Sequence, residues 1–116
     1  MCNHKNSKKI VYICHPFRGD ITGNQLKVMY ICRAIKRECV PLAPHLLLPH
    51  YLNEKTERKL ALGHGLVLLR ASDEVWIMSE RISDGMKGEI KEARRLGIPV
   101  RDKTNLLPSA KAKRRI

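Results

Sequence analysis

The sequence predicts a single α/β domain built on a parallel sheet, and three observations support that prediction. Short apolar runs rich in β-branched residues, at residues 10–14 and 73–78, are typical of strands buried on both faces. Segments of crossover length with helical periodicity separate these runs. The chain has 116 residues, enough for one domain with its own core. We therefore expect a Rossmann-like or flavodoxin-like domain with four or five parallel strands flanked by helices.

The expected elements alternate along the chain. Strands are predicted at residues 10–14, 40–43, 73–78 and 98–100, and helices at residues 23–38, 54–69 and 85–96. Asn24 is a suitable N-cap for the first helix, and Gly97 is a suitable residue to end the last one. Residues 44–50, with two prolines, are expected to form a loop. The middle helix is apolar on more than one face, which suggests that a second subunit covers part of it.

The charge is strongly positive but unevenly distributed. The net charge is +12, of which residues 1–9 carry +3 and residues 101–116 carry +5, leaving 12 − 3 − 5 = +4 for residues 10–100. We expect flexible basic tails at residues 1–9 and 103–116 around a domain of residues 10–102. Nucleic acid could then bind only through the tails, which lack interleaved aromatic residues.

Several other classes of protein fit the sequence poorly. There is no run of about 18 apolar residues and hence no membrane span, so we expect a cytoplasmic protein. The four cysteines are irregularly spaced and are expected to be reduced thiols. A zinc site from Cys14, His15, His45 and His50 lacks standard ligand spacing. We expect neither a metal ion nor a cofactor.

Glu89 is a carboxylate at the border of a core-facing stripe. Met86, Ile90 and Ala93 form that stripe, and at about 100° per residue Glu89 falls beside it. A half-buried carboxylate has a reactivity set by its surroundings. The alternative is a surface glutamate that pairs with Arg18 or a lysine, and the helical pattern alone favours this alternative.

Two polar loops follow predicted strands, at the sheet edge where open α/β sheets bind ligands. The first, HPFRGD, offers the cation Arg18 and the carboxylate Asp20. The second holds Ser83, which by pattern is an N-cap. Free N–H groups at a helix N-terminus also bind phosphate, and Gly85 would let a ligand approach the backbone.

Four other residues have both a structural and a functional interpretation. Tyr12 lies in a predicted strand, where a buried hydroxyl needs a partner. His15 and His45 each follow a strand and could line one cleft, although a lone histidine is more often structural. Asp73 starts a strand and is more typical of a residue that orders nearby backbone.

The segments YICHPFRGD (residues 12–20) and SDGMKGE (residues 83–89) resemble the nucleoside 2-deoxyribosyltransferase superfamily, which includes deoxynucleoside monophosphate N-glycosidases. Residues 10–100 also resemble an uncharacterised branch of it, the domains of unknown function DUF4406 and DUF7768. The motifs that carry this resemblance are HPFRGD, PHLLLPHYL, DEVWIM, ISDGMKGEI and GIPV.

The resemblance implies a nucleotide N-glycoside hydrolase or a deoxyribosyltransferase-like enzyme. Glu89 matches the nucleophile that attacks the sugar anomeric carbon, and Tyr12 matches the residue that orients it. Arg18 and Ser83 match phosphate contacts, so the implied partner is a small-molecule nucleotide rather than a free nucleoside. With the neighbouring loop residues added, we expect the substrate- or phosphate-binding set to be His15, Arg18, Gly19, Asp20, Ser83, Gly85 and Met86, with His45 and Asp73 as residues that could line the cleft. The family builds its sites between subunits, which implies a homodimer or a larger homo-oligomer.

Two departures from the family pattern leave other functions open. Residues 60–69, LALGHGLVLL, contain no acid where the family usually has one, and the chain ends in the basic KAKRRI rather than in a catalytic carboxylate. Base exchange is therefore in doubt, while hydrolysis stays open. The alternatives are a non-catalytic nucleotide-binding or sensor module and a basic nucleic-acid accessory protein.

Overall fold

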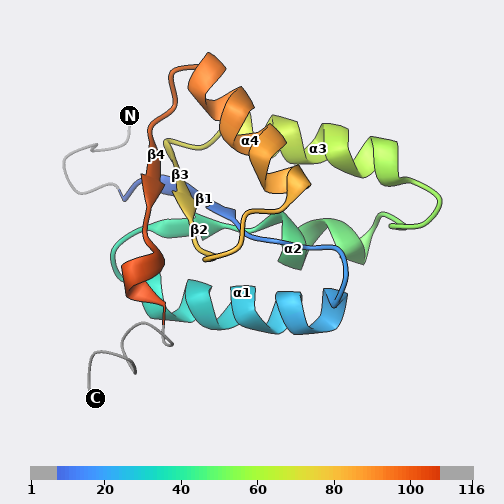
Figure 1. Cartoon of the computed structure of the whole chain (residues 1–116), viewed down its shortest axis with the longest axis horizontal. Helices are drawn as coiled ribbons and strands as arrows, with labels where there is room; N and C mark the ends of the chain where they lie inside the picture. Colours follow the sequence, from blue (N-terminus) through green and yellow to red (C-terminus); the bar gives the residue numbers. More distant parts are fainter. Residues whose placement is uncertain (1–7, 108–116) are drawn as a thin grey trace, which may run out of the picture.

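Four parallel strands form the centre of the molecule, a computed structural model that describes residues 8–107 (Figure 1). The strands are β1 (Ile10–Cys14), β2 (Val40–Leu42), β3 (Glu74–Ile77) and β4 (Val100–Asp102). Their order in the sheet is β2-β1-β3-β4, and each neighbouring pair is parallel. This is the flavodoxin-like order, with a topological switch point between β1 and β3. The predicted fold class is confirmed.

Helices cover both faces of the sheet. Helix α1 (Ile21–Ile35) lies on one face, and α3 (Arg58–Arg70) and α4 (Asp84–Arg95) lie on the other (Figure 1). The short helix α2 (Pro44–Leu47) continues into the 3-10 turn η1 (Leu48–His50) and packs beside α1. A second 3-10 turn, η2 (Thr104–Leu106), follows β4. No helix in the described part of the chain is both long and apolar enough to cross a membrane.

The side chains of β1 divide between two apolar clusters. Val11 and Ile13 pack with the buried face of α1. Tyr12 and Cys14 point the opposite way, into the cluster that the sheet forms with α3 and α4. All four side chains are buried, as expected for a central parallel strand. Because side chains alternate along a strand, the face that carries Tyr12 also fixes the direction of its hydroxyl group.

Helix α1 begins earlier than predicted because Asp20, and not Asn24, is its N-cap. Asp20 Oδ1 accepts a hydrogen bond from the Gly23 backbone N–H at 3.0 Å. Asn24 lies inside the helix and is buried. Its side-chain amide donates to the carbonyls of Phe17 and Arg18, at 3.0 and 3.3 Å, and so holds the loop after β1.

The segment between β2 and α3 also differs from the prediction. The loop expected at residues 44–50 is helical, because Pro44 at the first helical position has a backbone angle that suits a helix start. The next helix begins at Arg58 rather than at residue 54. Asn53 folds the chain into a turn there, since its Oδ1 accepts from the N–H groups of Lys55 and Thr56 at 2.9 and 3.2 Å.

The C-terminal part of the domain extends beyond the predicted last strand. Gly97, at φ 75°, ends α4 as expected, but β4 begins only at Val100. Leu106 and Leu107 pack against the core cluster on the α1 side, so the packed chain continues past residue 102. Residues 1–7 and 108–116, which hold most of both predicted basic tails, lie outside the described residues.

Three apolar side chains of α3 are about half exposed: Leu60 at 49%, Leu62 at 52% and Val67 at 60%. This agrees with the apolar character that the sequence gives to more than one face of the helix. The second subunit that this pattern suggested stays a prediction.

Glu74 stabilises the amino-terminal edge of the sheet. Its buried carboxylate accepts from Lys9 Nζ at 2.7 Å, Trp76 Nε1 at 2.9 Å and Arg101 Nε at 3.0 Å. The hydrogen bonds from Lys9 and Trp76, with smaller contributions from Arg101, lower the pKa of Glu74 to about 2. The stabilisation is therefore present above pH 4–5 and is lost as the pH falls toward 2.

We expect Glu74→Gln to lower the free energy of unfolding at neutral pH by about 1–3 kcal/mol, because charge-assisted bonds are replaced by weaker ones. The variant should also lose less further stability between pH 5 and pH 2 than the wild type. Urea unfolding at several pH values measures both effects. Equal acid sensitivity of the two proteins would contradict this account of Glu74.

Candidate active site

Glu89 lies on α4, over the carboxyl half of β1, and protein donors contact both of its oxygens. The Tyr12 hydroxyl donates to Oε2 at 2.5 Å, and the Cys14 thiol donates to Oε1 at 3.6 Å. The Tyr12 and Cys14 side chains are buried, and Glu89 is half-buried. The alternative of a surface Glu89 paired with Arg18 does not describe this arrangement. Its neighbour Glu92 is the carboxylate that forms surface ion pairs.

The environment of Glu89 disfavours its charged form. Burial raises the pKa of Glu89, and the hydrogen bonds from Tyr12 and Cys14 offset only part of that effect. Burial, with Glu89 nearby, also raises the pKa of both Tyr12 and Cys14, so these two groups stay protonated. They therefore act as donors to the carboxylate. A carboxyl group with a raised pKa in such a place is a common mark of a functional site.

Helix α3 contributes Gly65 to the same place. A side-chain carbon at residue 65 would lie 3.8 Å from the Tyr12 hydroxyl oxygen. The Tyr12–Glu89 pair is therefore set between α3 and α4. From the sequence, Gly65 was not identified as part of a site, and Cys14 was considered only as a member of a zinc site.

The N-terminus of α4 presents Ser83 and Gly85 next to this pair in the chain. Ser83 is the N-cap, as the pattern predicted: its Oγ accepts from the Met86 N–H at 3.2 Å. Gly85 is exposed in the first turn. The Met86 side chain is only 1% exposed and belongs to the core cluster with Tyr12, so its side chain is not placed to contact a ligand.

His15 and His45 form a buried pair beneath the loop after β1. His45 Nε2 donates to the His15 carbonyl, and His15 Nδ1 donates to the Pro16 carbonyl, both at 2.8 Å. Burial lowers the pKa of both rings, for His45 to about 4, so both are neutral at pH 7. These histidines hold the loop in shape and attach it to α2.

Asp73 lies at the opposite end of the sheet and does not line this site. Its Oδ2 accepts from the Ile10 N–H at 2.7 Å, where β1 and β3 begin. The correction follows from strand direction, because the amino ends of parallel strands share one edge and the ligand-binding carboxyl ends share the other. The backbone-ordering interpretation of Asp73 is the one that fits.

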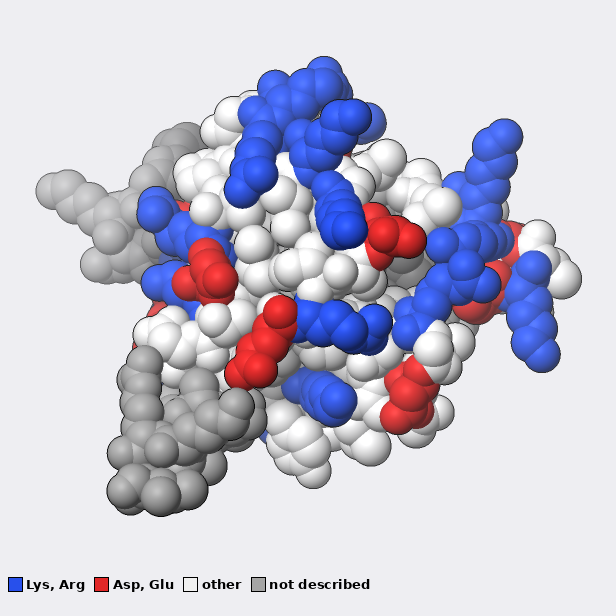
Figure 2. Space-filling model, in the orientation of Figure 1, with Lys and Arg blue, Asp and Glu red and all other residues white. Residues whose placement is uncertain are grey.

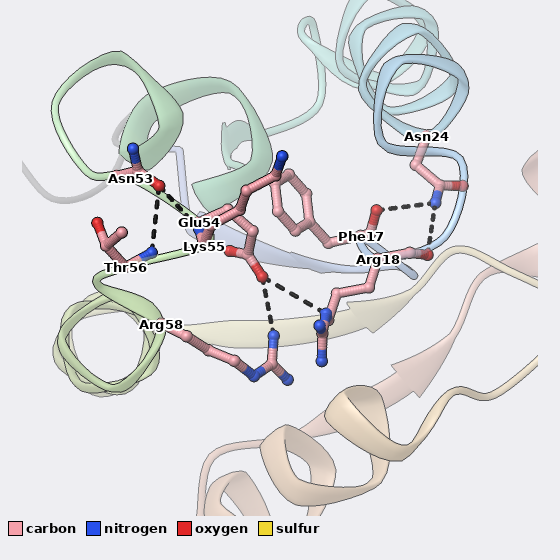
Figure 3. Close-up of polar contacts among 8 residues, drawn as sticks. All are labelled: Phe17, Arg18, Asn24, Asn53, Glu54, Lys55, Thr56 and Arg58. Atoms are coloured by element: carbon pink, nitrogen blue, oxygen red, sulfur yellow. Dashed lines mark hydrogen bonds and ion pairs between the residues drawn. The ribbon is translucent and has the colours of Figure 1, made fainter.

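The loop after β1 presents Arg18 at the surface. Gly19 has φ 95°, in the left-handed region that favours glycine, and Asp20 is engaged in capping α1. Arg18 Nε lies 3.5 Å from Glu54 Oε1, and Arg58 Nη1 donates to the same oxygen at 2.8 Å (Figure 3). The sequence did not reveal the roles of Glu54 and Arg58, because a helix was expected to begin at residue 54.

The carboxyl edge of the sheet favours anions. Helices α1 and α4 begin there because each follows a strand directly, and α3 begins after the α2–η1 segment that follows β2. Each N-terminus carries a partial positive charge and free N–H groups. Figure 2 shows lysine and arginine side chains gathered over α4 and over the start of α3. The chain has Lys55 in the turn before α3, and Arg58 and Lys59 in the first turn of that helix. The arrangement suits a negatively charged ligand.

Two open surface hollows lie away from Glu89. One of about 530 Å³ is lined by Thr56, Glu57, Lys59, Leu60, Gly63 and His64. The other, of about 430 Å³, lies between α1 and the α2–η1 segment. Within residues 8–107, no three His, Cys, Asp or Glu side chains form a group that could hold a metal ion.

The fold is shared with a solved 2-deoxyribosyltransferase. The 2-deoxyribosyltransferase of Bacillus psychrosaccharolyticus superposes with a TM-score of 0.54 at 18% sequence identity, over 78% of this chain and 69% of that one. Residues 9–103 match the family described as Domain of unknown function (DUF7768), and the chain belongs to that family. No curated protein sequence matches the chain. The predicted resemblance is thus confirmed for the fold and for DUF7768, while DUF4406 stays a prediction.

Tyr12 should control the titration of Glu89. The hydrogen bond from Tyr12 lowers the pKa of Glu89, so Tyr12→Phe is expected to raise that pKa further. Carbon-detected NMR of the glutamate carboxyl groups across a pH series measures the shift. Tyr51→Phe, which removes an exposed hydroxyl bonded to His64, is the matched control and should leave the Glu89 titration unchanged.

Proposed function

We propose that this protein is a nucleotide N-glycoside hydrolase or a deoxyribosyltransferase-like enzyme in which Glu89 is the nucleophile. The observation that carries the proposal is the Tyr12–Glu89 hydrogen bond on a half-buried carboxylate. The 2-deoxyribosyltransferase fold supports the same class of chemistry.

The proposed reaction uses chemistry that a carboxylate can supply. Cleavage of the bond between the anomeric carbon and the base develops positive charge on the sugar, and ionised Glu89 stabilises that charge or forms a bond to the anomeric carbon. The departing base keeps the bonding electrons and takes up a proton. In the second step, water attacks the anomeric carbon and releases Glu89, or another base takes the place of water.

Tyr12 and Cys14 would position the nucleophile. Each donates to a different oxygen of Glu89, which fixes the plane of the carboxylate relative to α4. Each oxygen keeps a lone pair that can face a sugar. Both residues come from β1, the central strand, so the nucleophile is held by a rigid element.

Arg18 and Ser83 support a nucleotide rather than a free nucleoside as the substrate. Arg18 is an exposed cation on the loop after β1, with 64% of its side chain accessible. Ser83 caps α4 at a helix N-terminus, where phosphate groups bind well. Gly85, exposed in the first turn, leaves the backbone open to a ligand.

The first experiment is incubation of the protein with a panel of deoxynucleoside and nucleoside monophosphates, with free base measured by chromatography. Base release from at least one nucleotide is expected, and Glu89→Ala and Glu89→Gln should reduce the rate by at least about a thousandfold. Loss of the nucleophile removes a covalent or electrostatic step of that size. Glu92→Gln is the matched control, because Glu92 is in the same helix and pairs only with surface arginines. Undiminished base release by Glu89→Ala would overturn the proposal.

The pH dependence of base release should follow the ionisation of Glu89. The nucleophile must be charged, and burial raises its pKa, so the rate should rise with pH through a value above that of an ordinary glutamate. In Tyr12→Phe the rise should move to higher pH. A rate that is flat from pH 4 to 8 in both proteins would be inconsistent with this assignment.

A second function is a nucleotide-binding or sensor module without turnover. Protein donors contact both Glu89 oxygens, and burial favours the neutral form of this carboxyl group. These features suit a carboxyl group that hydrogen-bonds sugar hydroxyls. In the nucleotide panel, this function predicts binding with no free base and recovery of unaltered nucleotide.

A further inference from the structure

One carboxylate near the carboxyl edge of the sheet is shared by two arginines from different elements. Glu54 Oε1 lies 2.8 Å from Arg58 Nη1 and 3.5 Å from Arg18 Nε. Arg58 is the first residue of α3, and Arg18 belongs to the loop after β1 (Figure 3). Glu54 and Arg58 are four residues apart, and Arg18 comes from a distant segment, so this cluster is more than a pair within one helix.

The backbone beneath Glu54 is firmly held. Asn53 Oδ1 accepts from two N–H groups of the turn, and the Asn53 N–H donates to Glu57 Oε1 at 2.9 Å. The Glu57 N–H in turn donates to the Asn53 carbonyl at 2.8 Å. The backbone at Glu54 is therefore fixed by this turn.

The exposure of the three side chains shows where a ligand could reach them. Arg18 and Arg58 are 64% and 41% accessible, whereas Glu54 between them is 26% accessible. A guanidinium group has five N–H donors, so contact with one carboxylate oxygen leaves donors for another anion. Paired, partly exposed guanidiniums suit the oxygens of a phosphate group.

The charge balance of the cluster also points to a phosphate ligand. Two cations and one carboxylate leave a charge of +1, and the N-terminus of α3 adds partial positive charge at Arg58. Without the Glu54 carboxylate the two guanidiniums would carry +2, which matches a phosphate monoester dianion. The Glu54 carboxylate thus lies between two cations whose combined charge suits a phosphate.

We propose that Arg58 and Arg18 together bind the phosphate group of the ligand, and that Glu54 occupies the place of that phosphate in the ligand-free protein. This inference depends on the proposed function in one respect, because it takes a nucleoside monophosphate as the natural ligand. It assigns Arg58 as a phosphate-binding residue. It makes Glu54 an internal competitor, so that removal of a carboxylate strengthens the binding of an anion.

The test is isothermal titration of the protein with inorganic phosphate and with the nucleoside monophosphate and nucleoside panel, at low ionic strength. Arg58→Gln should weaken phosphate and monophosphate binding roughly tenfold, with no change for nucleosides. Lys59→Gln is the matched control, because it removes the same charge from the same helical turn.

Glu54→Gln should strengthen phosphate binding roughly threefold to tenfold, because it keeps the side-chain size and removes the competing charge. Glu38→Gln, which removes an exposed carboxylate elsewhere, should change it little.

Three results would overturn the inference: no binding of phosphate or any monophosphate to the wild type, equal losses for Arg58→Gln and Lys59→Gln, or weaker binding by Glu54→Gln. Thermal unfolding of each variant should be unchanged, which shows that a loss of binding is not a loss of folding. Arg58→Lys should bind phosphate more weakly than the wild type, because lysine keeps the charge but lacks the guanidinium group. The outcome is distinct from that of the proposed function. Phosphate binding that follows this pattern without base release would leave the inference standing and reject the glycosidase. Base release by the wild type, with phosphate binding unaltered in Arg58→Gln and Glu54→Gln, would support the glycosidase and reject the inference.

Discussion

The pairing of β1 on both sides is the constraint on which the rest of this structure depends. Tyr12 lies opposite Leu42 of β2 and Val75 of β3, so its register is set twice. A shift by one residue would turn the Tyr12 hydroxyl to the α1 face and bring Val11 or Ile13 to the opposite face. The buried side chains on both faces oppose such a shift. The direction of the hydroxyl that meets Glu89 is thus a consequence of sheet assembly.

The surroundings of Glu74 and Glu89 have opposite electrostatic character. Glu74, at the amino edge, is bonded by two cations and an indole N–H, and its pKa falls to about 2. Glu89, nearer the carboxyl edge, meets a hydroxyl and a thiol, which are neutral donors, and its pKa is raised. The first arrangement favours a permanent charge that stabilises the fold. The second raises the pKa of a carboxyl group, and such shifts are common at functional sites.

Local pattern was enough to predict the sheet and most of the helices. Apolar runs identified β1 and β3, and the stripe of Met86, Ile90 and Ala93 correctly placed Glu89 at the border of the buried face. The contact between Glu89 and Tyr12 spans 77 residues, and no local pattern encodes such a contact. It was expected only because the motifs resemble a known superfamily.

The errors have equally specific causes. Proline and histidine in residues 44–50 suggested a loop, but proline also suits the first turn of a helix, where α2 begins. The turn that Asn53 makes depends on its side chain bonding to the backbone, and hydrophobic periodicity does not detect such bonds. That turn separates Glu54 from α3 and places it beside Arg18. Asp73 was included with the site although it starts a strand, and parallel topology puts strand starts at the far edge.

The alternation of side chains along β1 separates two kinds of constraint on the sequence. Val11 and Ile13 are constrained by packing against α1, while Tyr12 and Cys14 are constrained by their hydrogen bonds to Glu89. On the α1 side, substitutions that conserve side-chain volume are tolerated and leave the Glu89 carboxylate in place. Substitutions at Val11 and Ile13 can therefore change the packing of the α1 face without changing the contacts of Glu89, even though all four residues are consecutive in one five-residue strand.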